Sequence, residues 1–238
     1  MQMISIIIPV YNESEILQQS LLKLHQYLSQ KNRPFEIITV NNGSGDDTQA
    51  KALVMEKKIN NYRALDIPEK SVGKAFAKGV REARYDFVIS LDADLSVDLA
   101  FIDYAEGLLP FADMIVGSKT LGQQKRSWVR VLGSQLYLMV TQILFHMTIT
   151  DFSMGAKAFR RQSILPILDY IDSWTAYVFE ICTWLIKNKK TVLQIGVQCN
   201  DQRPSHFNIW HEGFYRYWNL YRVWKELKQE DSWFNKIK

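Results

Sequence analysis

Two aspartates one residue apart carry the most specific chemical signal in the chain. Asp92 and Asp94 stand in "SLDADLS", directly after the apolar run at residues 86–91. Carboxylate oxygens are the ligands that Mg²⁺ and Mn²⁺ prefer, and proteins often hold these ions jointly with the phosphates of a substrate. The same pair could instead cap the helix that follows, because Asp-x-Asp is common by chance. From these residues alone both interpretations stay open.

A second polar cluster, "NNGSGDDT" at residues 41–48, follows the apolar run "FEIITV" at residues 35–40. It permits three interpretations: a β-hairpin turn at Asn-Gly, a glycosylation acceptor at Asn-Gly-Ser, or a strand-to-helix turn at the mouth of a nucleotide site. Asp46 and Asp47 are followed by a helical segment that runs to about residue 58, and acidic residues favour a helix N-terminus. The sequence therefore predicts a strand-to-helix turn.

The segments that must position these clusters alternate between strands and helices. Strands are predicted at residues 4–10, 35–40, 62–67, 86–91 and 113–118, and helices begin near residues 17, 46 and 74, with another between 92 and 113. Asn12 or Ser14 is placed to cap the first helix. Such alternation predicts an α/β fold with a mostly parallel sheet, whose ligands bind at the carboxyl ends of the strands.

The second half is less regular. A basic stretch from Lys119 to Arg130 precedes an apolar helix at residues 128–146, a strand at 155–159, a helix at 177–187 and a strand at 192–197. The tail spaces five aromatic residues as one helical face with basic residues around it: Trp210, Phe214, Trp218, Tyr221 and Trp224. A helix of this kind either lies at a membrane interface or docks its aromatic side chains into the core, and both interpretations stay open.

Composition narrows the classes of function. With 238 residues, 47% hydrophobic and 23% charged, the chain is typical of a globular protein. A net charge of +4 without dense basic clusters argues against nucleic acid as a partner. Cys182 and Cys199 lack metal-type spacing and are typical of reduced thiols in a cytosolic protein. We find neither a signal-peptide pattern nor about 18 uninterrupted apolar residues, so we expect a soluble or peripheral protein, which weakens the glycosylation interpretation.

Longer blocks of sequence resemble family 2 glycosyltransferases. "SIIIPVYNE", "EIITVNNGSGDDT", "GKAFAKGVREARYDFVISLDADLS" and "ADMIVGSK" follow one another in the order and spacing of that family. More narrowly, the chain resembles the polyprenol-phosphate (dolichol-phosphate mannose synthase type) branch over residues 4–205, through "RVLGS", "DFSMGAKAFRR", "FE" and "RPSH". The resemblance implies a GT-A fold, a nucleotide-diphosphate sugar donor, Mg²⁺ or Mn²⁺, and inversion at the anomeric carbon.

The resemblance also implies an organisation and a set of site residues. One domain would cover residues 1–205, with a nucleotide-sugar half at 1–118 and an acceptor half at 119–205, followed by the aromatic and basic helix at 206–238. The nucleotide-binding candidates are Pro9, Tyr11, Glu13, Asn42, Ser44 and Asp92. The metal candidates are Asp92 and Asp94, and the catalytic candidates are Asp94, Arg130 and Arg203, whose arginines would hold phosphates. The remaining candidates are Ser96, which replaces a usual glutamine, Lys119, Asp151 and Glu180.

Two of these candidates have a structural alternative. Asp151 and Glu180 could be buried carboxylates that pair with Lys157, Arg160 or Arg161 rather than take part in catalysis. The chain also differs from the family at "NNGS" (residues 41–44), where relatives usually read "DDGS". An aspartate can only accept hydrogen bonds, whereas an asparagine can also donate them, so Asn42 predicts relaxed or altered base selectivity.

We therefore expect a metal-dependent inverting glycosyltransferase that moves a hexose onto a polyprenyl (dolichyl) phosphate. It would work at the cytoplasmic face of a membrane, bound peripherally or through an anchoring partner protein. A phosphate acceptor is already ionised, which fits the lack of an evident general base. Two alternatives stay open: an enzyme acting on a glycan, lipid-linked saccharide or protein hydroxyl, and a catalytically weak nucleotide-sugar-binding subunit of a membrane complex.

Overall fold

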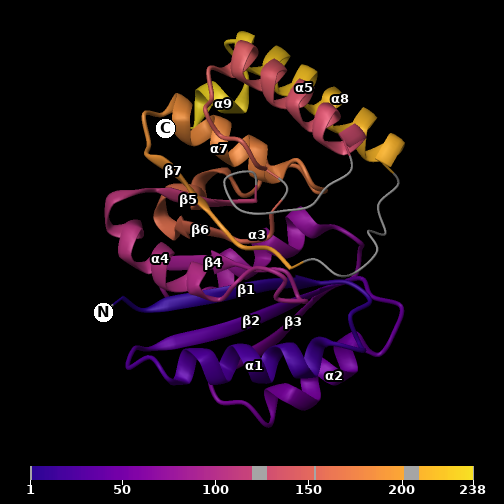
Figure 1. The fold of residues 1–238 in the computed structure, drawn as a ribbon, viewed down its shortest axis with the longest axis vertical. Helices are drawn as coiled ribbons and strands as arrows, with labels where there is room; N and C mark the ends of the chain where they lie inside the picture. Colours follow the sequence, from indigo (N-terminus) through magenta and orange to yellow (C-terminus); the bar gives the residue numbers. More distant parts are fainter. Residues whose placement is uncertain (1, 120–127, 153, 201–208, 238) are drawn as a thin grey trace.

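A single seven-stranded sheet runs through the middle of the molecule (Figure 1). The computed structural model describes residues 2–119, 128–152, 154–200 and 209–237, with backbone only for 128–135 and 209–213. The strands are β1 (Ile4–Val10), β2 (Phe35–Asn42), β3 (Tyr62–Ile67), β4 (Phe87–Ser90), β5 (Met114–Ser118), β6 (Lys157–Arg160) and β7 (Val192–Gly196). Their order across the sheet is β3-β2-β1-β4-β6-β5-β7.

The sheet is parallel except at β6. This strand lies between β4 and β5 and pairs with both in the antiparallel direction. All other neighbours are parallel pairs. The predicted α/β fold with a mostly parallel sheet is confirmed, and the predicted strand near residues 155–159 is present as β6.

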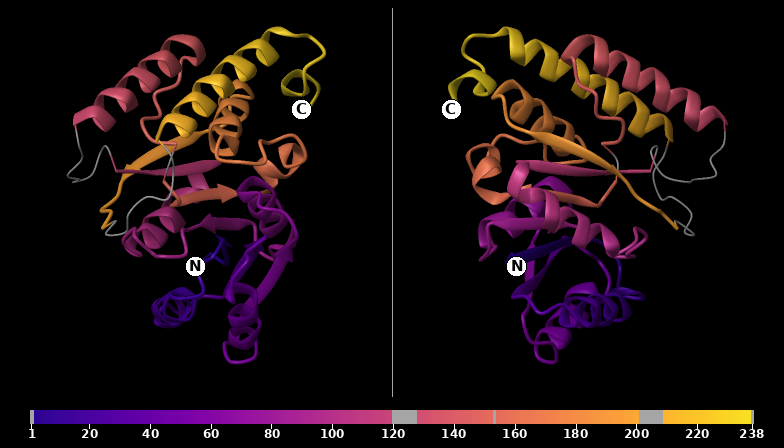
Figure 2. Two further views of the ribbon diagram at one scale, coloured as in Figure 1. Left: turned by 90° about the vertical axis from the view of Figure 1, so that its right-hand side faces the viewer. Right: turned by 60° about the vertical axis from the view of Figure 1, so that its left-hand side comes forward.

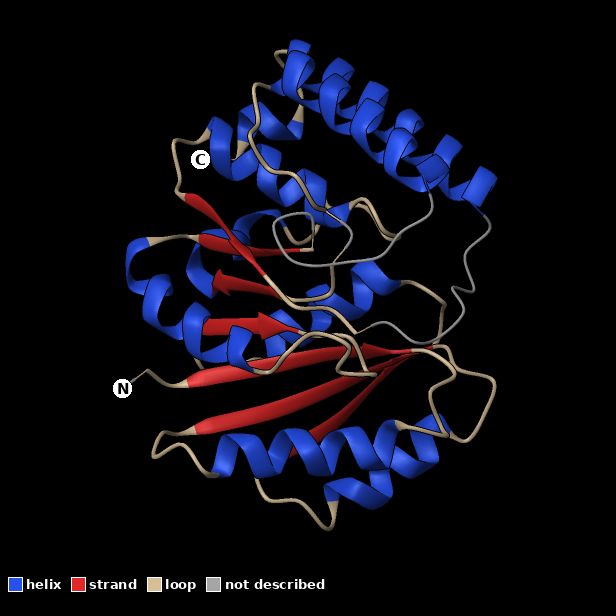
Figure 3. Ribbon diagram, viewed as in Figure 1, coloured by secondary structure: helices blue, strands red, loops and turns tan. Residues whose placement is uncertain are grey.

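Helices cover both faces of the sheet (Figure 3). The long helices are α1 (Leu17–Ser29), α2 (Thr48–Glu56), α3 (Val72–Glu82), α4 (Ala100–Leu108), α5 (Trp128–Phe145), α7 (Tyr177–Lys187) and α8 (Ile209–Lys228). Short segments are α6 (Arg161–Ile164), α9 (Trp233–Lys236) and the 3₁₀ turns η1 (Leu109–Phe111) and η2 (Leu165–Ile167). None of the described helices combines the length and hydropathy needed to cross a membrane.

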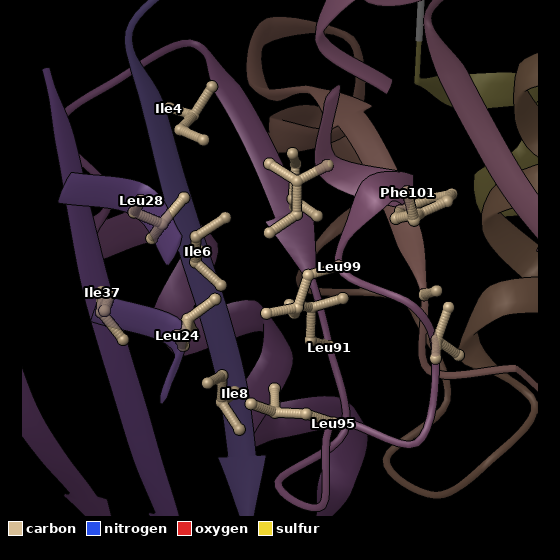
Figure 4. Packing of buried hydrophobic residues seen from close by; sticks show 14 of the residues in the cluster. Ile4, Ile6, Ile8, Leu24, Leu28, Ile37, Leu91, Leu95, Leu99 and Phe101 are labelled. Carbon is tan, nitrogen blue, oxygen red and sulfur yellow. The ribbon is translucent and has the colours of Figure 1, made fainter. Parts of the chain in front are cut away.

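Two hydrophobic cores hold these layers together. One core packs α1, α2 and α4 against one face of the sheet, and Figure 4 shows Ile6 of β1 among Leu24 of α1 and Ile37 of β2. The other core packs α3 and α7 against the opposite face. Because β1 and β2 are buried on both faces, their sequences read as continuous apolar runs rather than as an alternation.

The helices α5 and α8 lie side by side outside α7, on the side of the molecule farthest from α1 and α2 (Figures 1 and 2). Tyr137 of α5 meets Tyr217 of α8 with ring centroids 5.8 Å apart. Leu220 and Val223 of α8 point inward and are buried. Eight large apolar side chains described on the two helices stay exposed. The six that are at least half exposed form what we call the α5/α8 face: Leu136, Met139, Ile143, Phe214, Trp218 and Tyr221.

The structure differs from the sequence predictions at two places that matter for the site. The strand β2 continues through Asn41 and Asn42, because both pair with β3 opposite Asp66 and Ile67, so these asparagines end a strand and do not lie in the following loop. The predicted capping of α1 by Asn12 or Ser14 is wrong, since α1 begins after Ile16 without a side-chain cap.

Candidate active site

The loops after β1 and β2 are joined by hydrogen bonds at the carboxyl edge of the sheet. The Asn12 N–H donates to Ser44 Oγ over 2.9 Å, and the Gly45 N–H donates to Asn12 Oδ1 over 2.9 Å. The Glu13 N–H donates to Thr48 Oγ1 over 2.8 Å. Asn12 adopts a positive φ of 53°, a conformation that asparagine tolerates better than most residues. The side chains of Asn12 and Ser44 are therefore used to fix the two loops against each other.

Asp46 closes the same junction. Its carboxylate accepts hydrogen bonds from the Thr48 N–H at 3.0 Å and from the Ser14 N–H at 3.2 Å. Burial alone would raise the pKa of Asp46, but the hydrogen bonds from Thr48 and Ser14 outweigh it and lower the pKa to about 2. Asp46 is thus ionised over the whole physiological pH range. The predicted turn from strand to helix between β2 and α2 is confirmed.

Tyr11 shares this edge with a cation. Pro9 lies in β1 opposite Val40 of β2, and Tyr11 follows two residues later and is half-buried. The Lys70 Nζ lies 4.0 Å from the centroid of the Tyr11 ring and 5.6 Å from that of Trp174. Lys70 was not among the residues that the sequence indicated, and it brings a positive charge next to the predicted nucleoside-binding loop.

The two asparagines at the end of β2 have different surroundings. Asn41 donates from Nδ2 to Asp66 Oδ1 over 2.6 Å, across the β2–β3 pair. Asn42 accepts at Oδ1 a hydrogen bond from the backbone N–H of Ser71, the residue that caps α3. Both side chains are buried, with exposed fractions of 4% and 5%. Burial of Asn42 leaves no room for a glycan, so the glycosylation interpretation does not fit this position.

The turn after β4 holds the Asp-x-Asp pair. Ala93, Leu95 and Val97 are buried in the core, while Asp92 and Asp94 keep contact with solvent. Figure 4 shows Leu91, Leu95 and Leu99 on the core side of this segment. Ala93 and Leu95 anchor the turn in the core. Both carboxylates are therefore held at the carboxyl edge of the sheet.

Backbone geometry tightens this turn. The Leu95 N–H donates to the Asp92 carbonyl over 3.1 Å, and the Ser96 N–H donates to Asp94 Oδ1 over 3.0 Å. Leu95 has a positive φ of 48°, which is uncommon for a bulky residue and typical of a functional turn. Ser96 also accepts at its carbonyl from the Asn200 N–H over 2.8 Å. Ser96 thus contributes its backbone to the turn.

Several charged side chains lie near the Asp92 carboxylate. Although its side chain reaches solvent, the surrounding protein raises its pKa by burial, Lys157 opposes this increase, and Asp94 and Glu13 add to it. The Gly155 backbone hydrogen-bonds to the Asp92 carboxylate. A Cβ atom at position 155 would lie 2.1 Å from Asp92 Cγ. Only glycine therefore allows this approach.

The donor set suits a divalent cation shared with a substrate. Neighbouring carboxylates such as those around Asp92 are stabilised when a cation neutralises them. Among the described residues no group of three or more His, Cys, Asp or Glu side chains is arranged to hold a metal by itself. Two carboxylates on one short turn instead match the way that Mg²⁺ is bound, through one or two carboxylates together with phosphates of the substrate.

Lys157 is a buried cation between two carboxylates, and the sequence indicated it only as an ion-pair partner. Its side chain on β6 is 3% exposed, and its Nζ donates to the Met154 carbonyl. Burial lowers its pKa, while Asp92 and Asp151 raise it. Asp151 is itself buried and accepts from the Lys119 N–H over 3.3 Å. A lone lysine inside the apolar strand "GAKAF" is the signal that could have indicated this position.

Glu180 lies outside the cluster of charged residues around Asp92. It is fully buried at the start of α7, forms an ion pair with Arg222 of α8 and accepts from the Asp172 N–H. The expected pairing of Glu180 with Lys157, Arg160 or Arg161 is wrong, because α8 packs over α7 and supplies Arg222. Burial raises the pKa of Glu180 to about 7, and the charge of Arg222 limits the increase.

Two predicted catalytic residues lie outside the described side chains. Arg130 lies in the first turn of α5, where only the backbone is described. Arg203 lies outside the described residues. The described structure therefore brings together Glu13, Asp92 and Asp94 with Lys157 and Asp151. It places Tyr11 and Asn42 on the same edge of the sheet.

Known proteins match this chain over most of its length. The dolichyl-phosphate beta-glucosyltransferase of Trichomonas vaginalis is 27% identical over 225 residues, which are 87% of this chain and 68% of that protein. The undecaprenyl-phosphate 4-deoxy-4-formamido-L-arabinose transferase of Serratia proteamaculans is 27% identical over 70% of this chain and 51% of its own length. The chain thus spans about half the length of the second relative.

Solved structures show the same fold. The glucosyl-3-phosphoglycerate synthase from Mycobacterium tuberculosis, crystallised with Mn²⁺ and uridine-diphosphate-glucose, superposes with a TM-score of 0.66. The match covers 94% of this chain and 78% of that one at 15% identity. This likeness shows that the sheet and its helices form a GT-A fold.

The sequence model described as Glycosyl transferase family 2 matches residues 5–165, which is more than half of the chain. That segment includes the loops after β1 and β2, the Asp92–Asp94 turn and the buried Lys157. The chain is therefore a glycosyltransferase that belongs to glycosyl transferase family 2.

Proposed function

We propose that the enzyme transfers a hexose from a nucleotide-diphosphate sugar to a polyprenyl phosphate, with inversion at the anomeric carbon. The observation that carries the donor side is the convergence of Asp92, Asp94 and Glu13 near Tyr11 and the end of β2 at Asn42. The acceptor is supported by the relatives, whose names specify dolichyl and undecaprenyl phosphates. Residues 1–118 would bind the donor and residues 119–205 the acceptor.

Within this proposal, Asp92 and Asp94 would hold a Mg²⁺ or Mn²⁺ ion, whose chemistry is to neutralise charge on the departing diphosphate. The positive charge of Lys157 opposes the increase that burial causes in the pKa of Asp92. Pro9, Tyr11, Ser44 and Asn42 would border the nucleoside. Arg130 and Arg203 would bind phosphate groups, since guanidinium groups match phosphate geometry.

The acceptor requires little proton transfer. A phosphate monoester is ionised near pH 7, so its oxygen can attack without a strong general base. Asp151 is buried and is engaged by the Lys119 N–H and by Lys157. Its role in this proposal is to balance the charge of Lys157. Glu180 has a structural role between α7 and α8.

A polyprenyl acceptor resides in a membrane, and the α5/α8 face is suited to reach it. Leu136, Met139 and Ile143 form one stripe on α5, and Phe214, Trp218 and Tyr221 form one on α8. Basic residues follow the same helix at positions 216, 225 and 228. Aromatic residues combined with basic ones favour the headgroup region of an anionic bilayer. We propose peripheral binding at the cytoplasmic leaflet through this face.

Phe214→Glu tests the membrane contact. Phe214 is 76% exposed, so the substitution should leave the fold intact while it removes one apolar anchor and adds a repulsive charge. We expect the affinity for vesicles of phosphatidylglycerol and phosphatidylcholine to fall by roughly tenfold or more, measured by co-sedimentation. Phe111→Glu is the matched control, because Phe111 is also 76% exposed but lies on η1. Equal losses for both variants would contradict a specific face.

Gly155→Ala tests the geometry of the metal site. The added methyl group would lie 2.1 Å from Asp92 Cγ and would push the carboxylate from its place. We expect kcat/KM for sugar transfer to fall by roughly a hundredfold, as displacements of about 1 Å can do, while the melting temperature changes little. Gly107→Ala is the control, because a Cβ there meets nothing within 4 Å. A Gly155→Ala enzyme with unchanged activity would remove Asp92 from the site.

The function itself is tested by incubating the full chain with Mn²⁺, a polyprenyl phosphate and radiolabelled UDP-, GDP- or CDP-hexoses. Label that moves into an organic-extractable, acid-labile lipid supports the proposal. Transfer to a saccharide or protein hydroxyl but not to lipid phosphate would overturn the acceptor. Absence of transfer from every donor would point to a nucleotide-sugar-binding subunit instead.

A further inference from the structure

The amide of Asn42 has a fixed orientation. Its Oδ1 accepts the hydrogen bond from the Ser71 backbone N–H. A backbone N–H can only donate, so the oxygen must face Ser71 and the NH₂ group must point the other way. Within the part of the chain that the structure describes, Asn42 Nδ2 has no hydrogen-bond partner, although the side chain is only 5% exposed. This donor is therefore available to an acceptor on a bound ligand.

The neighbours of Asn42 show where that donor lies. In the β1–β2 register Val10 is opposite Asn41, so Tyr11 comes next to Asn42 at the edge of the sheet. Lys70, the residue before Ser71, places its Nζ 4.0 Å from the centre of the Tyr11 ring. Asn42 therefore shares its edge of the sheet with Tyr11 and Lys70, where the proposed function puts the nucleoside.

Asn41 does not offer a free donor to a ligand in this way. Successive side chains of a strand point to opposite faces of the sheet, and Asn41 Nδ2 already donates to Asp66 Oδ1 over 2.6 Å. An aspartate at position 41 would bring a second carboxylate against Asp66. Asn41 thus has a structural reason to be an amide, whereas the amide of Asn42 leaves a donor available.

An aspartate at position 42 would act differently. One of its oxygens could accept from the Ser71 N–H, and the other could accept from the ring N–H of uracil or guanine. With asparagine the first contact is kept, but the second group becomes a donor. A ring N–H would then meet an N–H, whereas the unprotonated N3 of cytosine offers an acceptor at the equivalent place.

We propose that Asn42 makes the nucleotide site select a cytidine diphosphate over uridine and guanosine diphosphates. The inference rests on the proposed function only in that the site binds a nucleoside diphosphate. The selectivity follows from one atom, the Nδ2 that replaces a carboxylate oxygen, and from the Ser71 N–H that prevents the amide from turning over.

Titration calorimetry of the full chain with CDP, UDP and GDP, each with MgCl₂, tests this inference without any transfer reaction. We expect CDP to bind about tenfold or more tightly than UDP, the size expected when two buried donors oppose each other. Asn42→Asp should reverse the CDP/UDP ratio, and Asn42→Ala should bring it near unity. Asn41→Asp is the matched control and should leave the wild-type ratio unchanged.

Wild-type binding of UDP or GDP as tight as that of CDP would overturn the inference, as would an Asn42→Asp variant with the wild-type ratio or no binding of any of the three. The ratio of the CDP and UDP affinities of the wild-type protein tests the inference even if a variant fails to fold. The proposed acceptor fails separately: selective CDP binding without transfer to polyprenyl phosphate would leave the base selectivity standing and remove the lipid acceptor.

Discussion

Asp94→Ala should nearly abolish sugar transfer while the protein stays folded. Asp94 keeps contact with solvent, and its carboxylate accepts a hydrogen bond from the Ser96 N–H in the turn after β4. Removal of one of two proposed metal ligands should lower kcat by about a thousandfold, which corresponds to several kcal/mol of lost charge stabilisation in the transition state. Fold retention is expected because the buried anchors of the turn are Ala93 and Leu95.

The measurement compares kcat for hexose transfer with the far-UV circular dichroism of the same preparation. Asp98→Ala is the matched control, because Asp98 is an exposed carboxylate of the same segment that accepts from the Ala100 N–H. Its activity should remain close to wild type. If Asp94→Ala transferred sugar at the wild-type rate, the Asp-x-Asp turn would not be the catalytic centre and the role of the chain would be binding.

Arg222→Met should have the largest effect on stability. Glu180 has a side chain that is 1% exposed, and Arg222 is the cation paired with it. Loss of that cation leaves a buried carboxylate without a charge partner, which typically costs about 3–5 kcal/mol. Because the Arg222 side chain is 38% exposed and water screens the pair, we expect about 3 kcal/mol of unfolding free energy at slightly alkaline pH.

The effect should depend on pH. Burial raises the pKa of Glu180 from 4.5 in an unfolded chain to about 7. Between these values the folded state binds more protons than the unfolded state, so the contribution of Glu180 to stability falls as pH rises through about 7. Loss of Arg222, whose charge lowers this pKa, raises it further, and the carboxyl group then stays protonated in mild acid. Arg222→Met should therefore cost less at about pH 5.5 than at about pH 8.

Urea unfolding at the two pH values measures the difference. In a Glu180→Gln background the residue at position 180 cannot ionise, and the pH-dependent part of the cost should disappear. Arg81→Met is a surface control, because Arg81 pairs with Asp169, whose side chain is 80% exposed, and such pairs contribute little. A cost for Arg222→Met that is the same at both pH values would show that packing of the guanidinium, not its charge, holds α8 to α7.

Local patterns predicted most of the fold because they depend on burial that the sequence itself encodes. Continuous apolar runs indicated β1 and β2, and leucines at helical spacing indicated α1. The direction of β6 could not be predicted, since it depends on how the chain returns to the sheet. The extension of β2 through Asn41 and Asn42 depends on pairing with β3, whose residues lie more than twenty positions away.

The site was predictable in part for the same reason. The Asp92–Asp94 turn and the loops after β1 and β2 are local motifs, and the structure brings them to one edge. Gly155, which precedes β6, and Lys157 of β6 approach Asp92. No local pattern encodes this contact across more than sixty residues. The partner of Glu180 could not be predicted either, because α8 comes from the far end of the chain.

The position of β6 also bears on how the chain can fold. The strand β5 contacts β4 only through β6, which lies between them, and its other neighbour in the sheet is β7. During synthesis β1 to β4 can assemble as soon as they emerge, but β5 must wait until residues 157–160 have been made. A fragment that ends at residue 118 would carry β5 as an unpaired apolar strand exposed to aggregation. Residues 1–118 and the segment that carries β6 must therefore fold together.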